Sequence, residues 1–303
     1  MILVTAGAPY LDIDAYAGCV AYAELLRLLG KEAIAISTAP WNASITRALR
    51  ALHAPLQTQY QPNKTDSFVL VDLSNSAFFD TIVDLERVIE IFDHHTGFED
   101  YWSKKLGKKS HIEFIGAAAT LIYEQWLQAA KLEAMSRENA TLLAAAILDN
   151  TLNFGADITN ERDKEAYKFL ASHASLDNGW IATYFLECQA EIMKDLPGAL
   201  RNDTKFLQFK GLRDKVYCSQ QTTWDAEAVI AAKQTVIADM LSTVSTCWLA
   251  NIISISEKCS YFLSDDQEVQ GWLQNLLGVK FKGTIARADR LWLRKEIMKI
   301  AQV

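Results

Sequence analysis

Long hydrophobic runs are missing from this sequence. Its apolar stretches stay well short of the roughly 20 residues that a membrane-spanning helix needs, and no basic segment precedes the short apolar start at residues 1–7. With only 5 prolines and 13 glycines in 303 residues, the composition excludes collagen-like and low-complexity chains. We therefore expect a globular cytoplasmic protein that is neither secreted nor inserted in a membrane.

Paired cysteines and an excess of positive charge are missing as well. The 5 cysteines are scattered and never form a Cys-x-x-Cys pair, so neither a disulfide framework nor a zinc site is indicated. The formal net charge of -7 argues against broad electrostatic binding to nucleic acid. We expect reduced cysteines, mostly in the core, and a partner other than long nucleic acid.

Short β-branched runs alternate with helical patterns through the first two-thirds of the chain. The predicted strands are residues 2–5, 33–37, 68–72 and 88–92, and the predicted helices are 15–29, 44–52, 117–132, 137–149 and 161–173. This alternation is typical of βαβ units. It predicts an α/β fold with a doubly wound N-terminal domain and a mainly parallel sheet.

A second pattern begins after a break at Pro197 and Gly198. Beyond the break, strands are predicted at 206–209, 216–219 and 248–254, and helices at 225–243 and 266–277. We therefore expect two domains, residues 1–194 and 195–303, the second being a smaller α+β domain. Residues 195–202 are predicted to form the hinge between them.

Acidic and histidine side chains gather where the predicted strands of the first domain end. They are Asp12, Asp14, Asp72, Asp93, His94 and His95. Doubly wound sheets bind ligands beyond the carboxyl ends of their strands, so these side chains are expected to converge on one crevice. Asp149 ends an apolar helical run, where a carboxylate is costly unless a partner such as a metal ion offsets its burial.

Several carboxylates in one crevice repel each other unless cations neutralise them. Imidazole among the ligands favours Mn²⁺, Co²⁺, Fe²⁺ or Zn²⁺ over Mg²⁺ alone. Two such ions, roughly 3.5–4 Å apart, lower the pKa of a bridging water and hold a phosphoryl oxygen for in-line attack. The constellation therefore indicates a two-metal phosphohydrolase.

Five motifs in the first 150 residues resemble, in order, those of the DHH phosphoesterases. Asp93-His94-His95 is the triplet that names this superfamily, and the others are 12–15, 71–72, 113–120 and 146–151. Residues 203–206 and 293–300 resemble the C-terminal domain of family II inorganic pyrophosphatases and exopolyphosphatases. The chain has no Gly-Gly pair, so the Gly-Gly-Gly-His motif of the nanoRNase and single-strand exonuclease branches is absent.

The resemblance implies a role for each motif residue. Asp72 bridges two ions of Mn²⁺ (or Co²⁺ or Mg²⁺), Asp12 binds the first, and Asp14, His94 and Asp149 bind the second. His95 donates to the phosphate or leaving group, and Asp93 orients His94. Lys205, Arg294 and Lys295 bind the phosphates. The implied substrate is a small phosphorylated anion, pyrophosphate or short polyphosphate, and the family often forms homodimers.

The end of the chain supports a phosphate-binding role independently of the resemblance. Residues 280–299 carry seven basic side chains and only two acidic ones, in a chain that is negative overall. Such a basic face suits a compact polyanion. In the N-terminal domain, Gly116 precedes a predicted helix start whose backbone N–H groups are expected to help hold an anion.

The chain departs from the pyrophosphatase pattern at two points. Ala8 stands where those enzymes carry a metal-binding histidine, and Leu73-Ser74-Asn75 stands in place of His-Asn-Glu. Because alanine cannot coordinate, we expect a weaker first metal site. Two alternatives stay open: a phosphodiesterase acting on cyclic nucleotides or short oligonucleotides, and a catalytically weakened binding protein.

Overall fold

A computed structural model describes residues 1–301, which form two compact units. The first unit comprises Met1–Phe154 and Ile158–Trp180, and the second comprises Gly155–Asp157 and the chain from Ile181 onward. Among the described residues, none of the helices is long and apolar enough to cross a membrane. All five cysteines are buried thiols, as expected from their scatter.

The first unit contains a six-stranded sheet in the order β3-β2-β1-β4-β5-β6, and every neighbouring pair is parallel. The strands are β1 (Ile2–Thr5), β2 (Ala33–Ile36), β3 (Leu56–Gln57), β4 (Ser67–Val71), β5 (Val88–Asp93) and β6 (Ser110–Ile112). The chain builds outward from β1 in one direction and then returns to β4 to build in the other. The predicted doubly wound parallel sheet is therefore confirmed, with its switch point between β1 and β4.

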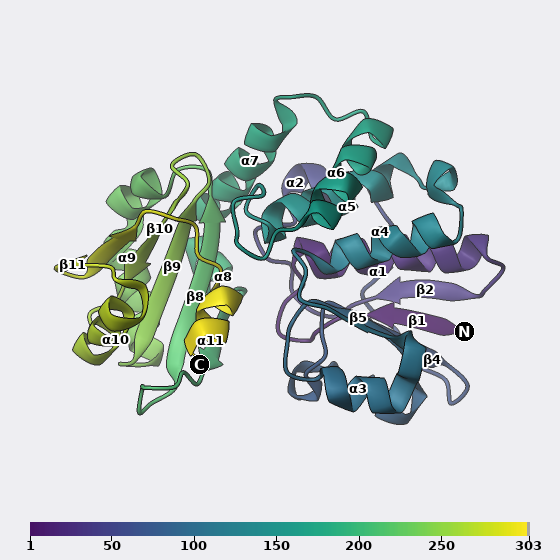
Figure 1. The fold of residues 1–303 in the computed structure, drawn as a ribbon, viewed down its shortest axis with the longest axis horizontal. Coiled ribbons are helices and arrows are strands. Elements are labelled where there is room, and N and C mark those ends of the chain that lie inside the picture. Colours follow the sequence, from purple (N-terminus) through teal and green to yellow (C-terminus); the bar gives the residue numbers. More distant parts are fainter. Residues whose placement is uncertain (302–303) are drawn as a thin grey trace. The chain divides into compact units, whose positions relative to one another are not determined.

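Six helices accompany this sheet in the described residues. They are α1 (Ile13–Leu28), α2 (Arg47–Arg50), α3 (Glu99–Leu106), α4 (Ala118–Gln128), α5 (Arg137–Asn150) and α6 (Glu161–His173). Figure 1 shows α1 and α4 over one face of the sheet and α3 over the other. Because both faces are covered, β4 is buried after its first residue and β5 is buried apart from Ile89, which suits the continuous apolar run of residues 68–71 in β4.

Helix α1 begins at the first strand end of the site and lies close against the sheet. Asp12 caps it by accepting a hydrogen bond from the N–H of Ala15. A Cβ placed on Gly18 would lie 2.5 Å from Cγ1 of Val71, so the glycine allows α1 to approach β4 at this point. This close packing fixes the start of α1 relative to the end of β4.

The second unit contains a mixed six-stranded sheet in the order β11-β12-β10-β9-β8-β7, in which only β8 and β9 are parallel neighbours. The strands are β7 (Thr204–Leu207), β8 (Val216–Thr223), β9 (Trp248–Ser254), β10 (Cys259–Leu263), β11 (Phe281–Lys282) and β12 (Ile285–Ala288). The helices are α7 (Trp180–Lys194), α8 (Leu196–Arg201), α9 (Ala226–Val244), α10 (Gln267–Leu277) and α11 (Arg294–Ala301). The α+β prediction for this part is confirmed.

Both faces of the second sheet are covered. Helix α9 packs against β8, β9 and β10, while Val269 and Leu273 of α10 and Ile297 of α11 join a core cluster with strand residues. Every residue of β9, at the centre, is buried. The sequence pattern predicts no strand at β10, which lies between the predicted strand 248–254 and the predicted helix 266–277. The strands β11 and β12 and helix α11 form in the basic end, for which no element is predicted.

The segment around Pro197 differs from the prediction. Residues 195–202 were expected to be a hinge, but α8 forms there, with Asp195 accepting from the N–H of Gly198 and with proline in its first turn. Its residues Leu196 and Leu200 are buried within the second unit. The compact units divide at Trp180–Ile181, so α7 packs with the second unit. The resemblance implies a metal-binding catalytic domain at residues 1–194 and a substrate-binding domain at 195–303, and these roles stay predictions.

Candidate metal centre

Asp72 lies directly after β4 in an unusual backbone conformation. Its φ is 59°, in the left-handed region that non-glycine residues rarely adopt and that aspartate tolerates better than most. The N–H of Asp72 donates to the carbonyl of Phe92 at 2.7 Å, which ties this turn to β5. Such conformations persist where the surrounding structure enforces them, often at functional sites. The Asp72 carboxylate is therefore held in place at the switch point of the sheet.

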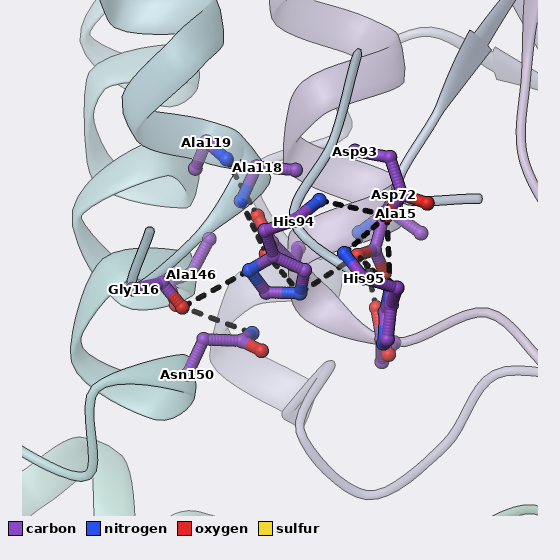
Figure 2. Close-up of polar contacts among 12 residues, drawn as sticks. Ala15, Asp72, Asp93, His94, His95, Gly116, Ala118, Ala119, Ala146 and Asn150 are labelled. Carbon is purple, nitrogen blue, oxygen red and sulfur yellow. Dashed lines mark hydrogen bonds and ion pairs between the residues drawn. The ribbon is translucent and has the colours of Figure 1, made fainter. Parts of the chain in front are cut away.

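The His94 ring lies between Gly116 and Asp72 (Figure 2). Its Nδ1 is 3.0 Å from the carbonyl oxygen of Gly116, which can only accept, so the proton is assigned to Nδ1. Its Nε2 lies 3.1 Å from Oδ1 of Asp72 and 3.7 Å from Oδ2 of Asp14. All three side chains are buried. The ring thus presents Nε2 to two carboxylates.

This arrangement fits a divalent metal ion. Two buried carboxylates facing Nε2 are unfavourable unless a proton on Nε2 or a cation between them offsets their charge, and a divalent cation can serve all three groups at once. Burial, together with the charges of Asp72 and Asp12, also raises the pKa of the Cys19 thiol well above its usual range. Single ligand atoms of Asp72, His94 and His95 all lie within 4.8 Å of one another. Carboxylate oxygen and imidazole nitrogen together suit Mn²⁺ or Co²⁺.

Asp14 is fixed by the start of α4. Its Oδ2 accepts from the N–H of Ala118 at 2.9 Å and its Oδ1 from the N–H of Ala119 at 2.7 Å. The N-terminal N–H groups of a helix favour a negative charge. The sequence predicted that this helix start would hold an anion, and in the structure it holds the carboxylate of Asp14.

Asp93 orients His95 rather than His94, and this corrects the role predicted for it. Oδ1 of Asp93 accepts from the backbone N–H groups of His94 and His95 and lies 2.8 Å from Nδ1 of His95. The ring of His94 is instead oriented by the carbonyl of Gly116. His95 is 44% exposed, so its outer ring edge is open to solvent.

The two remaining predicted ligands come from helix ends. Asp12 is the N-cap of α1, with Oδ1 3.0 Å from the N–H of Ala15. Asp149 is half-buried in the last turn of α5, a helix that packs against α1. The close-up of the centre includes its neighbour Asn150, so this helix end reaches the same region (Figure 2). The ligand roles of Asp12 and Asp149 stay predictions.

The predicted phosphate-binding residues all lie in the second unit. Lys205 of β7 lies opposite Cys218 of β8, and the carbonyl of Cys218 accepts from Nη1 of Arg294 at 3.0 Å. Arg294 also pairs with Asp203 at 2.8 Å, and its side chain is 11% exposed. Lys295 follows it in α11 and is half-buried. The Arg294 guanidinium therefore anchors α11 to the β7–β8 pair, whatever else it binds.

Sequence reasoning missed one buried carboxylate next to the centre. Asp163 of α6 is fully buried, and its Oδ2 accepts from the N–H of Gly116 at 3.1 Å. The pattern Asn160-x-x-Asp163 is a capping-box signal for the start of a helix. It indicates nothing about Gly116, which lies 47 residues earlier in the chain.

Comparisons with known proteins point to one family. A Bacillus licheniformis protein named probable manganese-dependent inorganic pyrophosphatase is 29% identical over 237 residues, which are 77% of this chain and 75% of that protein. A Listeria welshimeri protein of the same name is 26% identical over 235 residues, or 77% and 74% of the two chains. The chain resembles the family II inorganic pyrophosphatases. No protein-family model matches it.

The fold of the family II pyrophosphatases extends over the whole chain. A Methanococcus jannaschii protein described as a family II inorganic pyrophosphatase superposes with a TM-score of 0.75 at 21% identity, covering 100% of both chains. An exopolyphosphatase-related protein of Bacteroides fragilis superposes with a TM-score of 0.55 at 13% identity, covering 99% of this chain and 90% of the other. At these identities the likeness concerns the fold.

Ala8 remains the clearest departure from the pyrophosphatase pattern. Its N–H donates to the carbonyl of Phe78 at 2.9 Å, and Gly7 forms an isolated bridge with Phe79. The loop that precedes Asp12 is therefore ordered by backbone contacts, while the methyl group of Ala8 offers no ligand atom. The Asp12 side of the centre has one donor fewer than the pyrophosphatase pattern provides.

Proposed function

We propose that this protein is a metal-dependent phosphohydrolase that cleaves phosphoanhydride bonds of inorganic pyrophosphate or short polyphosphate. The observation that carries the proposal is the buried group of Asp14, Asp72 and His94 at the switch point of the parallel sheet. The likeness to proteins named manganese-dependent inorganic pyrophosphatases supports the substrate class.

Two divalent ions are part of the proposal, Mn²⁺ or Co²⁺ before Mg²⁺. One ion would be held by Asp14, Asp72, His94 and Asp149, and the other by Asp12 and the shared Asp72. When bound, such ions lower the pKa of a water molecule and neutralise charge on phosphoryl oxygens. The protein contributes preorganisation, since the N–H groups of α4 and the carbonyl of Gly116 hold two of these ligands before any metal binds.

His95 is proposed to contact the substrate. Asp93 holds its Nδ1 side, so the ring keeps one orientation while its exposed edge remains accessible. From there Nε2, when protonated, can donate to a phosphate or leaving-group oxygen. The Asp93–His95 pair would therefore position a proton donor.

Lys205, Arg294 and Lys295 are proposed to bind phosphate oxygens. All three lie in the second unit, where Arg294 donates to the carbonyl of Cys218, the residue that pairs with Lys205 across β7 and β8. Asp203 fixes the guanidinium of Arg294, which lowers the ordering cost of each further hydrogen bond that it makes. A homodimer stays a prediction.

A catalytically weakened, phosphate-binding protein is the second candidate function, and Ala8 is the observation that favours it. The loss of one ligand on the Asp12 side lowers the affinity for the ion there. Binding of a phosphorylated anion by the basic residues of the second unit does not depend on that ion. Turnover on any substrate separates the two candidates.

Phosphate release by the full-length protein tests the proposal. The metal-stripped protein is refilled with Mn²⁺, Co²⁺ or Mg²⁺ and assayed on pyrophosphate, tripolyphosphate, long polyphosphate and a dinucleotide. Asp72→Asn removes a proposed ligand charge, and Asp239→Asn makes the same change at an exposed position of α9 as the matched control.

We expect Mn²⁺-dependent phosphate release from pyrophosphate or tripolyphosphate by the wild type and by Asp239→Asn, and a rate lowered by more than roughly 10²–10³-fold in Asp72→Asn. Cleavage of the dinucleotide alone would replace this proposal with a phosphodiesterase. Metal and pyrophosphate binding without release from any substrate would favour the weakened binding protein.

A further inference from the structure

A fully buried carboxylate, Asp163, lies in the first turn of α6. It belongs to a capping box, in which the side chain of Asn160 accepts from the N–H of Asp163 and the N–H of Asn160 donates to Oδ2 of Asp163 at 3.0 Å. Capping alone does not require a buried aspartate, because caps commonly lie in water. The burial of Asp163 therefore needs another explanation.

Asp163 also binds both ends of the turn that begins α4. Its Oδ2 accepts from the N–H of Gly116 at 3.1 Å, and its Oδ1 accepts from the hydroxyl of Thr120 at 2.6 Å. The neighbouring Arg162 forms ion pairs with Glu113 and Glu124, which lie on either side of residues 116–120 in the sequence. The start of α6 thus clamps the segment that contains residues 116–120.

This turn carries the supports of two proposed metal ligands. The carbonyl of Gly116 accepts from Nδ1 of His94 at 3.0 Å. The N–H groups of Ala118 and Ala119 donate to the two carboxylate oxygens of Asp14. A displacement of the turn would therefore move both the His94 ring and the Asp14 carboxylate.

Gly116 allows the close approach on which this clamp depends. A Cβ at this position would lie 2.5 Å from Oδ2 of Asp163 and 2.6 Å from Cγ2 of Thr151. A real Cβ does not come that near to a neighbouring atom, so a larger residue would push the turn away from α6. Gly116 therefore allows the 116–120 turn to pack directly against the Asp163 carboxylate.

We propose that Asp163 is a positioning residue for the metal centre, acting on His94 and Asp14 through the 116–120 turn. The inference rests on the proposed function for the chemistry of that centre. Groups that orient metal ligands from behind typically account for about 10–100-fold in metal affinity. Asp163 differs from such groups by acting through a backbone turn that serves two ligands at once.

Two substitutions at this position separate hydrogen bonding from charge. Asp163→Ala removes both acceptors and frees the turn. Asp163→Asn keeps an oxygen for the N–H of Gly116, and its amide can donate to the hydroxyl of Thr120, which is able to accept. We expect Asp163→Ala to raise the Mn²⁺ dissociation constant by about 10–100-fold, and Asp163→Asn to restore most of the affinity.

Asn160→Ala is the matched control for a purely structural role. It removes the cap of the same helix but leaves the contacts of Asp163 with Gly116 and Thr120 in place. We expect it to lower the melting temperature while leaving the Mn²⁺ dissociation constant unchanged. Equal losses of Mn²⁺ affinity in Asn160→Ala and Asp163→Ala would overturn the inference.

The ring NMR spectrum of His94 gives a second readout that needs neither metal nor turnover. In the metal-stripped wild type, the proton on Nδ1 of His94 is buried and bound to Gly116, so its signal is expected to be observed. Asp163→Ala should shift or broaden that signal, and Asn160→Ala should not. An unchanged His94 signal in Asp163→Ala would refute the positioning role.

The two readouts also separate this inference from the proposed function. A wild type that binds no Mn²⁺ would reject the metal centre, while a His94 signal that depends on Asp163 would still support the positioning role. Should Asp163→Ala fail to fold, Thr120→Val removes one of the two anchors with little change in volume. It is then expected to weaken Mn²⁺ binding by up to about tenfold, and an unaltered affinity would count against the inference.

Discussion

The two sides of the proposed metal centre are built very differently. On the His94 side, which comprises Asp14, Asp72 and His94, the side chains are buried and backbone groups of another segment hold Asp14 and His94. On the Asp12 side, which comprises Ala8 and Asp12, the aspartate caps its own helix and the alanine offers no donor atom. The proposed centre is thus preorganised on the His94 side, while Ala8 offers no ligand atom on the Asp12 side. We therefore expect two metal sites of unequal affinity.

Asp72→Asn should have the largest effect, because this carboxylate is proposed to serve both sides. We expect kcat for phosphate release to fall by more than the roughly 10²–10³-fold that removal of one preorganised electrostatic group costs. Steady-state phosphate release with saturating Mn²⁺ measures it. Activity close to that of the wild type would mean that Asp72 does not bridge the two sides.

His94→Gln should lower the Mn²⁺ affinity of the tighter site, which lies on the His94 side. The substitution removes the nitrogen that faces Asp72 and Asp14. Removal of a group that only hydrogen-bonds a metal ligand typically lowers metal affinity by roughly 10–100-fold. Because His94 is itself a proposed ligand, we expect the Mn²⁺ affinity of the tighter site to fall by at least that factor. Calorimetric titration of the metal-stripped variant measures it, with His53→Gln, which lies outside the centre, as the control.

Ala8→His should reduce the difference in Mn²⁺ affinity between the two sites by strengthening the weaker one, on the Asp12 side. The substitution restores a ligand type at a position whose backbone contact with Phe78 does not depend on the side chain. We expect the weaker Mn²⁺ site to tighten by about tenfold or more, with a rise in activity at limiting metal. If neither the affinity nor the activity changes, Ala8 does not account for the asymmetry.

Glu90→Gln should lower the free energy of unfolding, and of these substitutions it should affect the metal centre least. Glu90 is buried in β5 and contacts Tyr22 at 2.5 Å and Lys109 at 2.7 Å. Burial acts to raise its pKa, but the contacts with His111, Lys109 and Tyr22 outweigh burial and lower it. A lowered carboxyl pKa adds stability that is complete above the unfolded pKa of about 4.3 and is lost as the pH falls through the folded pKa.

We therefore expect Glu90→Gln to reduce the free energy of unfolding by about 1.5–3 kcal/mol at neutral pH, which is the usual value for charged hydrogen bonds. The difference from the wild type should shrink in acid. Urea unfolding at neutral and acid pH measures both values. A difference that grows in acid would contradict the lowered pKa.

Much of the fold follows from sequence patterns that are local. Helix α6 and strands β1 and β9 occur at the residues predicted from periodicity and caps. The convergence of Asp14, Asp72 and His94 follows from a parallel sheet, which brings strand ends together. These features can be predicted without knowing which distant residues are in contact. Hydrophobic periodicity predicts the elements, and the rule that parallel strand ends meet at one edge predicts the convergence.

The choice of hydrogen-bond partners could not be predicted in the same way. Asp93 precedes two histidines, and only the backbone path after β5 decides that its carboxylate meets the ring of His95. The contact between Asp163 and Gly116 joins residues 47 positions apart. The 195–202 segment contains residues typical of a break, yet α8 forms because its apolar side chains are buried in the second unit.

Calorimetric titration of the metal-stripped, full-length protein with Mn²⁺ tests the asymmetric metal centre most directly. We expect a tighter and a weaker site, with the tighter one weakened in His94→Gln and the weaker one strengthened in Ala8→His. A titration without Mn²⁺ binding, or with two equal sites that neither substitution distinguishes, would contradict it.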